Sequence, residues 1–482
     1  MRNVIRKYYE DYPEYYDRIL AETEDGETYT YYDLKVFAEM LGEYVTPRNT
    51  VFVLCEHCVG ELFGILSFLR KKVVMYLFDS QLSNERIEEL LNEYTPNYMY
   101  VPVNQKENYP DYRVLFEKYG MALLVNQKVM VPPVKTDNLA FFLSTSGSTG
   151  DSKLVRSAYE NYVASSNSVI KMCGITKDDV TATFLPMQYA YAISTIFAHV
   201  AVGAKVIITK LPVIQNRFWE LCKEKKVTDF YAVPYMYECI CQLGIEERLG
   251  MFRTLSVAGG KLKTYVSEKC TRVAADHNVL FYNEYGQTEA GCMSYSIKSK
   301  DGSYHPEDNI GEPITDGKTY LLDVNNQIIT EKGVSGNLMY EGGSVCMGYC
   351  AGKHEIDKED PWKGVLNTGD IAVINDLGKI EIVGRAKRFI KIYGKRYSLD
   401  HIEHLMNQEV KDCQIVTSGI DGMLVIFTNN QDSIAACKKY IRTTYGISTE
   451  NYRVEYIETF PLNFNGKIAY AELLSYVNEK FA

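Results

Sequence analysis

The sequence predicts an α/β protein with a large N-terminal domain of mixed and parallel sheets, a smaller barrel-like subdomain and a small, mobile α+β C-terminal domain. Three observations lead to this prediction. Short apolar runs alternate with helical patterns between residues 137 and 286, strand-like runs separated by Gly and Asn follow Asn309, and a basic stretch ends at Arg396 before a last α+β segment. The 482 residues, 46% hydrophobic and 24% charged, have the composition of a globular protein.

The alternating region predicts a mostly parallel sheet, because strands that are buried on both faces are almost continuously apolar. The expected strands are residues 139–143, 205–209, 229–233, 254–257 and 279–282. Helical patterns separate some of them, at residues 214–226, 235–243 and 265–277. An earlier helix is expected at 32–45, where Leu34, Phe37 and Leu41 share one face.

The later part of the chain predicts a different architecture. Runs at 319–323, 327–330, 336–340 and 378–383 favour a small antiparallel or barrel-like subdomain at about 310–383. A helix is expected at 400–406. We therefore predict an N-terminal domain at 1–386 and a C-terminal domain at 387–482, with the boundary near Lys387.

Charge and apolar patterning exclude several classes of function. Lys and Arg number 52 against 62 Asp and Glu, and the net charge of −10 disfavours non-specific binding to nucleic acid. No apolar run reaches the roughly 18 residues of a membrane span, and no secretory signal is visible, so we expect a cytoplasmic protein. The 12 cysteines are too sparse for a disulfide scaffold and lack zinc-site spacing, which favours reduced thiols in the core.

A loop rich in small hydroxyl residues follows the strand at 139–143. It reads Ser144, Thr145, Ser146, Gly147, Ser148, Thr149, Gly150, Asp151, Ser152 and Lys153. Its backbone N–H groups can turn toward an anion, and Lys153 adds a positive charge. A P-loop nucleoside triphosphatase would need Gly directly before the lysine, and this chain has Ser152 there. A phosphate site outside the P-loop class and a plain surface turn both fit this loop by itself.

The loop resembles the signature of the adenylate-forming superfamily, which includes acyl-CoA synthetases, carrier-protein adenylation domains and firefly luciferase. Four other segments are similar to motifs of that family and follow in the same order. They are Asn283-Glu-Tyr-Gly-Gln-Thr-Glu289, Asn367-Thr-Gly-Asp370, the hinge-like segment 384–394 and Pro461-Leu-Asn-Phe-Asn-Gly-Lys467. Weaker similarities lie at residues 29–34, at Ala258-Gly-Gly260 and in 335–349, which closes on Met-Gly-Tyr.

The resemblance implies ATP-dependent activation of a carboxylic acid to an acyl-adenylate, with release of pyrophosphate and with Mg²⁺ bound to the nucleotide. The acyl group would then pass to a thiol, from coenzyme A or from the phosphopantetheine of a separate carrier protein. The acyl-CoA synthetase-like reaction is the main hypothesis, and a stand-alone adenylation enzyme that loads an acyl or peptidyl carrier is the alternative. A non-catalytic nucleotide-binding relative is a third hypothesis. Retention of the charged motif residues argues against it.

The resemblance also implies roles for individual residues. The loop from Ser144 to Gly150, with Lys153, would face the pyrophosphate side of ATP. The other implied nucleotide-binding residues are Asn283 and Tyr285 for adenine, Asp370 for the ribose diol, Arg385 for ribose or phosphate, Lys391 nearby, and Gly259, for which no separate contact is implied. Thr288 would contact the α-phosphate, Glu289 would hold Mg²⁺, and Lys467 would lie between the two reacting anions. Lys387 would be the hinge.

The acyl pocket is expected around the segment that begins at Tyr189. The proposed walls are Tyr189, Ala190, Tyr191, Val233, Val257 and Ala258, with Tyr231 and Met293 as further members. Amino-acid-activating relatives carry Asp where this chain has Ala190, and an ammonium buried without a carboxylate is costly. An apolar to semi-polar acyl or aryl acid is therefore expected. The chain also departs from the family pattern at Ser152, Asn337 and Tyr470.

Overall fold

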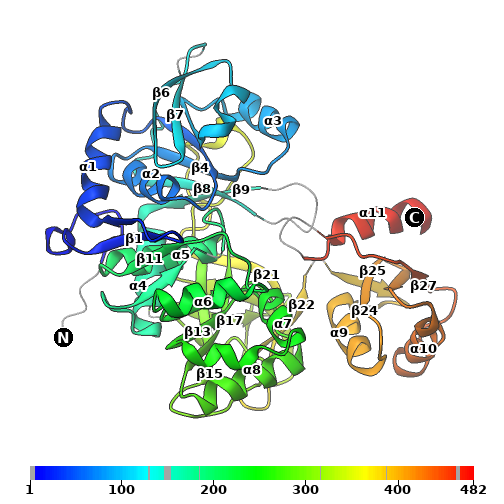
Figure 1. Ribbon diagram of the computed structural model, residues 1–482. Helices are drawn as coiled ribbons and strands as arrows, with labels where there is room; N and C mark the ends of the chain where they lie inside the picture. Colours follow the sequence, from blue (N-terminus) through cyan, green and yellow to red (C-terminus); the bar gives the residue numbers. More distant parts are fainter. Residues whose placement is uncertain are drawn as a thin grey trace. The chain divides into compact units, whose positions relative to one another are not determined.

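The computed structural model describes residues 6–128, 131–145, 153–183, 185–314, 316–386, 388–462 and 467–481. The chain divides into two compact units, which are described separately. The first contains Met1–Thr145, Lys153–Lys318 and Glu341–Leu366, and the second contains Thr319–Tyr340 and Asn367–Ala482. Figure 1 shows the order of the elements along the chain.

An eight-stranded mixed sheet forms one half of the first unit, in the order β20-β9-β8-β4-β3-β5-β7-β6. Its strands are β3 (Thr50–Cys55), β4 (Val74–Asp79), β5 (Tyr98–Pro102), β6 (Tyr112–Lys118), β7 (Met121–Asn126), β8 (Leu139–Ser144), β9 (Leu154–Ala158) and β20 (Tyr349–Cys350). The central strands β8, β4, β3 and β5 are parallel. Helices α1 (Tyr31–Gly42), α2 (Val59–Arg70) and α3 (Asn84–Tyr94) accompany this sheet. Almost every residue of α2 is buried, which explains its nearly unbroken apolar sequence.

A second sheet in the first unit has the order β12-β13-β14-β15-β16. It comprises the parallel strands β12 (Asp229–Ala232), β13 (Thr254–Val257) and β14 (Leu280–Gln287), then the antiparallel strands β15 (Gly291–Ser299) and β16 (Glu312–Pro313). Helices α6 (Asn216–Glu224), α7 (Pro234–Gln242) and α8 (Thr264–Asp276) cover one face, where their apolar residues form one core cluster with the strands. Helices α4 (Tyr159–Cys173) and α5 (Ala190–Ala201) also contact β15.

A four-stranded sheet completes the first unit, in the order β10-β11-β1-β2. Its strands are β10 (Val180–Ala182), β11 (Lys205–Ile208), β1 (Ile19–Thr23) and β2 (Thr28–Thr30). The helix α1 begins directly after β2, because Thr30 and Asp33 cap it reciprocally: the Thr30 side chain accepts from the Asp33 N–H, and the Asp33 carboxylate accepts from the Thr30 N–H.

The second unit contains a five-stranded sheet in the order β18-β17-β19-β21-β22. The strands are β17 (Lys318–Leu322), β18 (Ile328–Ile329), β19 (Ser335–Glu341), β21 (Val365–Ile374) and β22 (Ile380–Arg385). The described strands form an open sheet with β18 and β22 at its edges, which corrects the barrel-like prediction. The reason is that the edge strand β18 has only two residues, too few for the ladder that closure of a barrel requires.

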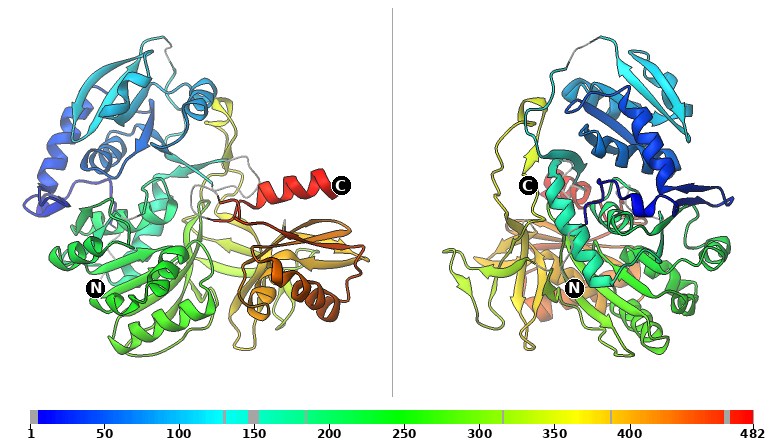
Figure 2. Two further views of the ribbon diagram at one scale, coloured as in Figure 1. Left: turned by 45° about the vertical axis from the view of Figure 1, so that its right-hand side comes forward. Right: turned by 90° about the vertical axis from the view of Figure 1, so that its left-hand side faces the viewer.

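The C-terminal part of this unit, also seen in Figure 2, is an α+β arrangement. It has the hairpin β23 (Phe389–Ile392) and β24 (Lys395–Ser398), the sheet β25-β26-β27, and the helices α9 (Leu399–Glu409), α10 (Ile434–Tyr440) and α11 (Tyr470–Phe481). The sheet strands are β25 (Ile415–Ile420), β26 (Met423–Thr428) and β27 (Tyr452–Tyr456). The expected domain boundary at Lys387 lies outside the described residues and stays a prediction.

The fold class is confirmed, since a large mixed α/β part is followed by a small α+β part. The predicted strands and helices of residues 137–286 are present, with ends that differ by a few residues. All twelve cysteines are free thiols, and ten of them lie in the first unit. Among the helices that the structure describes, none has both the length and the apolarity needed to cross a bilayer.

Candidate active site

The Ser/Thr/Gly loop connects two strands that are paired with each other. β8 and β9 run antiparallel, and the loop is closed at its base because the Thr145 N–H donates to the Lys153 carbonyl oxygen at 2.9 Å and the Lys153 N–H donates to Thr145 Oγ1 at 3.3 Å. A P-loop would lead into a helix, so the strand after Lys153 supports the rejection made from spacing. The predicted loop residues Ser146, Gly147, Ser148, Thr149 and Gly150 lie outside the described residues.

Tyr349 links two of the predicted nucleotide-site residues. Its hydroxyl donates to Glu289 Oε1 at 2.7 Å, and the Lys153 ammonium lies 5.0 Å from the centre of its ring. The backbone of Glu289 is held as well, because its carbonyl oxygen accepts from the Cys346 N–H at 2.9 Å. Sequence reasoning named Tyr349 only as the end of a weak motif. Its place in β20, beside β9, brings it close to Lys153, which directly precedes β9.

Replacing Tyr349 with Phe is expected to weaken ATP binding by about tenfold, because the hydrogen bond that orients the Glu289 carboxylate is lost while the ring beside Lys153 remains. Isothermal titration with MgATP measures this effect. Tyr349→Ala also removes the ring and should weaken binding further. Equal affinities for the wild type and Tyr349→Phe would mean that the hydroxyl does not orient Glu289 for the nucleotide.

The motif that begins at Asn283 continues β14 further than expected. The strand extends to Gln287, and Thr288 and Glu289 lie in the turn that leads to β15. Gly286 is required by packing, because a Cβ at this position would lie 2.4 Å from the Gly291 carbonyl oxygen. This close pairing of β14 with β15 places Thr288 and Glu289 at the tip of a tight hairpin.

Three of the predicted nucleotide-binding residues, Asn283, Tyr285 and Gly259, lie near the ends of neighbouring strands. Asn283 is buried, its Cα pairs with Val257 of β13, and its Nδ2 donates to the Asn309 carbonyl oxygen at 3.2 Å. Tyr285 is half-buried. Gly259 lies just beyond β13 with a φ of +87°, a conformation that a side chain would strain. The parallel strands β13 and β14 thus direct Gly259 and the Asn283 motif to the same edge of the sheet.

An ion pair between a buried carboxylate and a partly exposed guanidinium forms within the second unit. The Asp370 side chain is 3% exposed, and its Oδ1 lies 2.7 Å from Nε of Arg385. The pairing follows from register, since Asp370 and Arg385 are direct partners on β21 and β22. The Arg385 side chain also donates to the Thr368 carbonyl oxygen at 3.4 Å. Two predicted nucleotide ligands, 15 positions apart, are therefore brought together by one antiparallel ladder.

Lys467 joins this pair through electrostatics. Its pKa is lowered, first because surrounding protein atoms remove water from the ammonium and second because the Arg385 guanidinium is nearby, although part of the side chain remains exposed. Lys391 lies on β23 with an exposed side chain, and its N–H donates to Asp421 Oδ1 at 2.8 Å. The structure thus brings the positive charges of Arg385 and Lys467 within range of each other.

Tyr470 explains one departure from the family pattern. Its hydroxyl donates to Glu403 Oε1 at 2.6 Å, and the Arg388 guanidinium lies 3.6 Å from the centre of its ring. Arg388 also pairs with Glu403 at 3.0 Å. A basic residue at this position would bring a second cation beside Arg388, so a tyrosine fits the packing here. These contacts attach residue 388 to α9 and α11.

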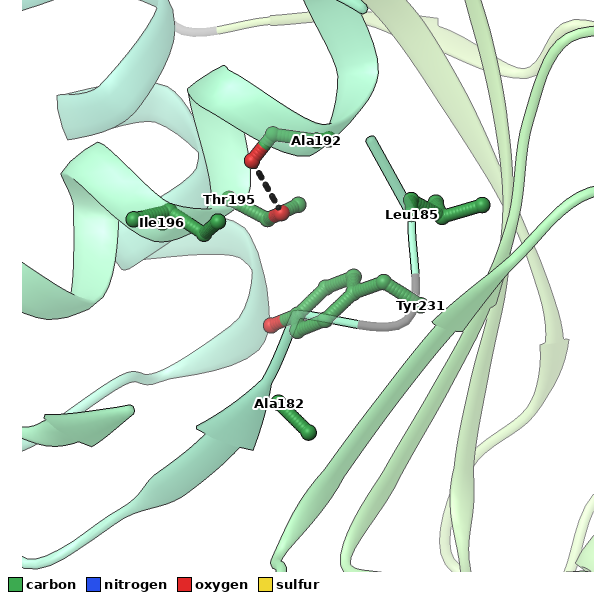
Figure 3. A pocket seen from close by; sticks show the side chains of 6 residues that line it. All are labelled: Ala182, Leu185, Ala192, Thr195, Ile196 and Tyr231. Carbon is green, nitrogen blue, oxygen red and sulfur yellow. Dashed lines mark hydrogen bonds between the residues drawn. The ribbon is translucent and has the colours of Figure 1, made fainter. Parts of the chain in front are cut away.

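A small cavity lies beside α5, and Figure 3 shows Tyr231 across it from Thr195 and Ile196. Its lining residues are Ala182, Leu185, Ala192, Thr195, Ile196 and Tyr231. The volume is about 10 Å³, close to the minimum for one water molecule. An aryl or acyl acid would need the surrounding side chains to rearrange. Sequence reasoning missed the three lining residues on α5, which their helical spacing after Tyr189 could have indicated.

None of the six principal predicted walls lines this cavity, whereas Tyr231, a further predicted member, does. Tyr189 is the N-cap of α5, and Ala190 and Tyr191 form its first turn. Val233 is the N-cap of α7, and Ala258 is buried just after β13. Val257 belongs to the core cluster shared with α6, α7 and α8. Its contacts favour a packing role, whereas the other five stay candidates for the walls.

The carboxylates available near the predicted nucleotide site suit a metal ion that is bound mainly by the phosphates of a nucleotide. Among the described residues, no cluster of three His, Cys, Asp or Glu side chains could hold a metal ion. Glu289 offers a half-buried carboxylate whose Oε1 accepts from Tyr349. Mg²⁺ is commonly bound by one or two carboxylates, by water and by the phosphates of a nucleotide. Glu289 fits such a site.

Solved structures and sequence relatives agree with this fold. ATP-bound MatB from Rhodopseudomonas palustris superposes with a TM-score of 0.79 at 16% identity, over 98% of both chains. The o-succinylbenzoate CoA synthetase MenE from Bacillus subtilis, in complex with its acyl-adenylate intermediate, gives a TM-score of 0.75 at 17% identity, over 95% of both chains. At these identities the likeness shows the fold.

Among sequence relatives, the 2,3-dihydroxybenzoate-AMP ligase of Bacillus subtilis is 25% identical over 73% of this chain and 67% of its own length. Gramicidin S synthase 2 of Brevibacillus brevis is 22% identical over 92% of this chain, which spans only 10% of that synthase. The family model described as AMP-binding enzyme matches residues 6–350. That match covers more than half of the chain, and the chain therefore belongs to the AMP-binding enzyme family.

Proposed function

We propose that the protein uses MgATP to activate a small carboxylic acid as an acyl-adenylate and then transfers the acyl group to a thiol. The observation that carries the proposal is the grouping of Asp370, Arg385 and Lys467, which come from three segments of the chain. A buried carboxylate suits a ribose diol, because it accepts from two adjacent hydroxyls. The two cations suit the place where a carboxylate and a phosphate converge.

In the first half-reaction, a carboxylate oxygen of the acid attacks the α-phosphorus of ATP, and the bond to the β-phosphate breaks to release pyrophosphate. Lys467 would neutralise the two approaching anions, and Thr288 would contact the α-phosphate. Lys153 would attract the β- and γ-phosphates. Glu289, oriented by Tyr349, would hold Mg²⁺, which screens the phosphate charges when bound.

In the second half-reaction, a thiolate sulfur attacks the acyl carbonyl carbon and AMP leaves. Coenzyme A is the acceptor that we propose first. Similarity to gramicidin S synthase 2 over 92% of this chain favours a second candidate, the phosphopantetheine of a separate carrier protein. Acid-dependent exchange of pyrophosphate into ATP tests the first step across a panel of acids. Thioester formation with coenzyme A, or with a loaded carrier protein, then distinguishes the acceptors.

We also propose that the segment after Lys387 turns as a unit between the two half-reactions. The strand β22 ends at Arg385, and residue 388 is attached to the C-terminal helices by its contacts with Glu403 and Tyr470. This arrangement leaves few residues between them to absorb a change of φ and ψ, as hinges do. The hydrogen bond from the Arg385 N–H to Asp400 Oδ2, at 2.7 Å, would break in such a turn.

Replacing Lys387 with Pro should therefore impair thioester formation more than adenylation, because the ring fixes φ and restricts the pivot. We expect pyrophosphate exchange to stay within about threefold of wild type while thioester formation falls at least tenfold. Lys387→Ala is the matched control, since it removes the charge and leaves φ free. Equal loss of both steps in a folded Lys387→Pro variant would contradict domain alternation at this residue.

A further inference from the structure

A buried carboxyl group and two tyrosine hydroxyls remain outside the roles assigned so far. Glu284 is 4% exposed and Tyr231 is 2% exposed. In the part of the chain that the structure describes, Glu284 Oε2 and the hydroxyl oxygens of Tyr231 and Tyr191 are buried and form no hydrogen bond of standard geometry, although the Cys173 thiol lies close to Tyr231 and the Ser256 side chain lies close to Tyr191. Buried polar groups are nearly always paired, so three such atoms in one region require an explanation.

The register of the sheet directs Glu284 and Tyr231 to the same side. Tyr231 of β12 pairs with Ser256 of β13, and Ser256 pairs with Tyr282 of β14. Neighbours in register share a face, and residues two apart on one strand do as well. Glu284 follows Tyr282 by two residues and therefore projects from the same face as Tyr231. The apolar residues that alternate with Tyr231, Ser256 and Tyr282 along these strands point to the other face, where they belong to the core cluster under α6, α7 and α8.

Tyr191 and the cavity lie on the Glu284 side of the sheet. The rings of Tyr191 and Tyr231 are 6.3 Å apart, in an edge-to-face arrangement. Tyr231 itself lines the cavity beside α5 (Figure 3). The charge of Glu284 is close enough to raise the pKa of both tyrosines, although burial is the larger cause of each shift. The three groups thus lie on the same side of the sheet, next to α5, and of the three Tyr231 lines the cavity.

Of the two oxygens of the Glu284 carboxyl, Oε1 accepts a hydrogen bond of standard geometry and Oε2 does not. The Ser256 hydroxyl donates to Oε1, and the Cys292 thiol lies beside the carboxyl, where Glu284 contributes to the raised pKa of that thiol. Burial raises the pKa of Glu284 as well. A hydrogen-bond donor brought in by a ligand would satisfy Oε2 and, if it were cationic, would favour the ionised carboxylate.

We propose that Glu284, together with the hydroxyls of Tyr231 and Tyr191, recognises a hydrogen-bond donor on the body of the carboxylic acid substrate, remote from its reacting carboxylate. The substrate class is thus an acid that also carries a hydroxyl or an amino group. This inference rests on the proposed function. It narrows the expected substrate class from an apolar to semi-polar acid to one with a hydrogen-bond donor. Glu284 would provide the carboxyl group that is missing at position 190, where amino-acid-activating relatives carry Asp and this chain has Ala190.

Matched acids test the proposal. The acids are benzoate with 3- and 4-hydroxybenzoate and 3- and 4-aminobenzoate, and hexanoate with 6-hydroxyhexanoate and 6-aminohexanoate. They separate hydroxyl donors, the neutral arylamine and the alkylammonium ion. Pyrophosphate exchange gives kcat/KM, and equilibrium binding of each acid in the presence of a non-hydrolysable ATP analogue gives Kd without turnover. A site built for hydrogen bonding rejects analogues that lack the group by up to about 10⁴–10⁵-fold. We expect at least a hundredfold preference for one donor-bearing acid over its partner.

The variants assign that preference to named groups. Glu284→Gln should reduce it at least tenfold, and Tyr231→Phe should reduce it partly. Tyr237→Phe is the matched control, because the Tyr237 hydroxyl already donates to the Ser256 carbonyl oxygen at 3.0 Å and projects from α7; it should leave the preference unchanged. Thermal unfolding identifies any variant that has lost its fold, and the Tyr231 variant then carries the test if Glu284→Gln does not fold.

The outcomes separate this inference from the proposed function. The inference is supported if the wild type binds a donor-bearing acid more tightly than its plain partner and the Glu284 variant does not. This holds even if no acid supports pyrophosphate exchange, a result that would show the proposed function to be wrong. Exchange with plain and donor-bearing acids at equal efficiency, or a preference that survives in both the Glu284 and the Tyr231 variants, overturns the inference and leaves the proposed function standing.

Discussion

Replacing Lys467 with Ala is expected to reduce acid-dependent pyrophosphate exchange by about 10²–10³-fold or more. The reason is that, in the proposed mechanism, its ammonium counters charge only while the acid carboxylate and the α-phosphate approach each other, an interaction that strengthens in the transition state. Reaction of preformed acyl-adenylate with the thiol should stay within a few-fold of wild type. Pyrophosphate exchange measures the first step. Thioester formation from chemically prepared acyl-adenylate measures the second step separately.

The control for this variant is Lys439→Ala, which removes an exposed lysine from α10 and should leave both steps unchanged. The pH dependence gives a second check. The pKa of Lys467 is lowered, so its proton is lost at a lower pH than that of an ordinary lysine, and exchange should fall as the pH rises through that value. Lys467→Arg, if active, should move the decline to higher pH. Near-normal exchange in Lys467→Ala would remove Lys467 from the reaction.

Replacing Asp370 with Ala is expected to weaken ATP binding by roughly 10- to 150-fold, which corresponds to about 1.5–3 kcal/mol for a hydrogen bond to a charged group. Two effects add up in this variant. The proposed acceptor for the ribose diol is lost, and Arg385 loses the carboxylate 2.7 Å away that fixes its direction. Equilibrium titration with MgATP measures the effect without a substrate acid.

Stability should change less than binding, because the Arg385 side chain is 53% exposed and water solvates the guanidinium once its partner is removed. Asp376→Asn is the matched control, since Asp376 lies exposed in the turn between β21 and β22. Unchanged ATP affinity in a folded Asp370→Ala variant would exclude Asp370 from the nucleotide site.

How well the sequence predicts the secondary structure differs from region to region. Residues 205–282 could be interpreted in advance, because apolar strands and amphipathic helices alternate there with clear ends. The strands β3, β4 and β5 were not predicted individually. Each is short and fully buried, and such a run has no period that separates it from a buried helix. The open sheet of the second unit was expected as a barrel, because closure depends on pairing between edges and leaves no local signal.

For the candidate site, the sequence by itself determined which residue types are available, since Lys153, Glu289, Asp370, Arg385 and Lys467 occur in family motifs with an ordered spacing. Tertiary structure decided which of them meet. The ladder of β21 and β22 pairs Asp370 with Arg385, and β20 brings Tyr349 to Glu289. It also decided that Glu284 is buried and that its Oε2 forms no hydrogen bond of standard geometry. A short motif specifies which side chains are present at neighbouring positions. Contacts between distant strands arise from register and burial, which depend on the whole sheet.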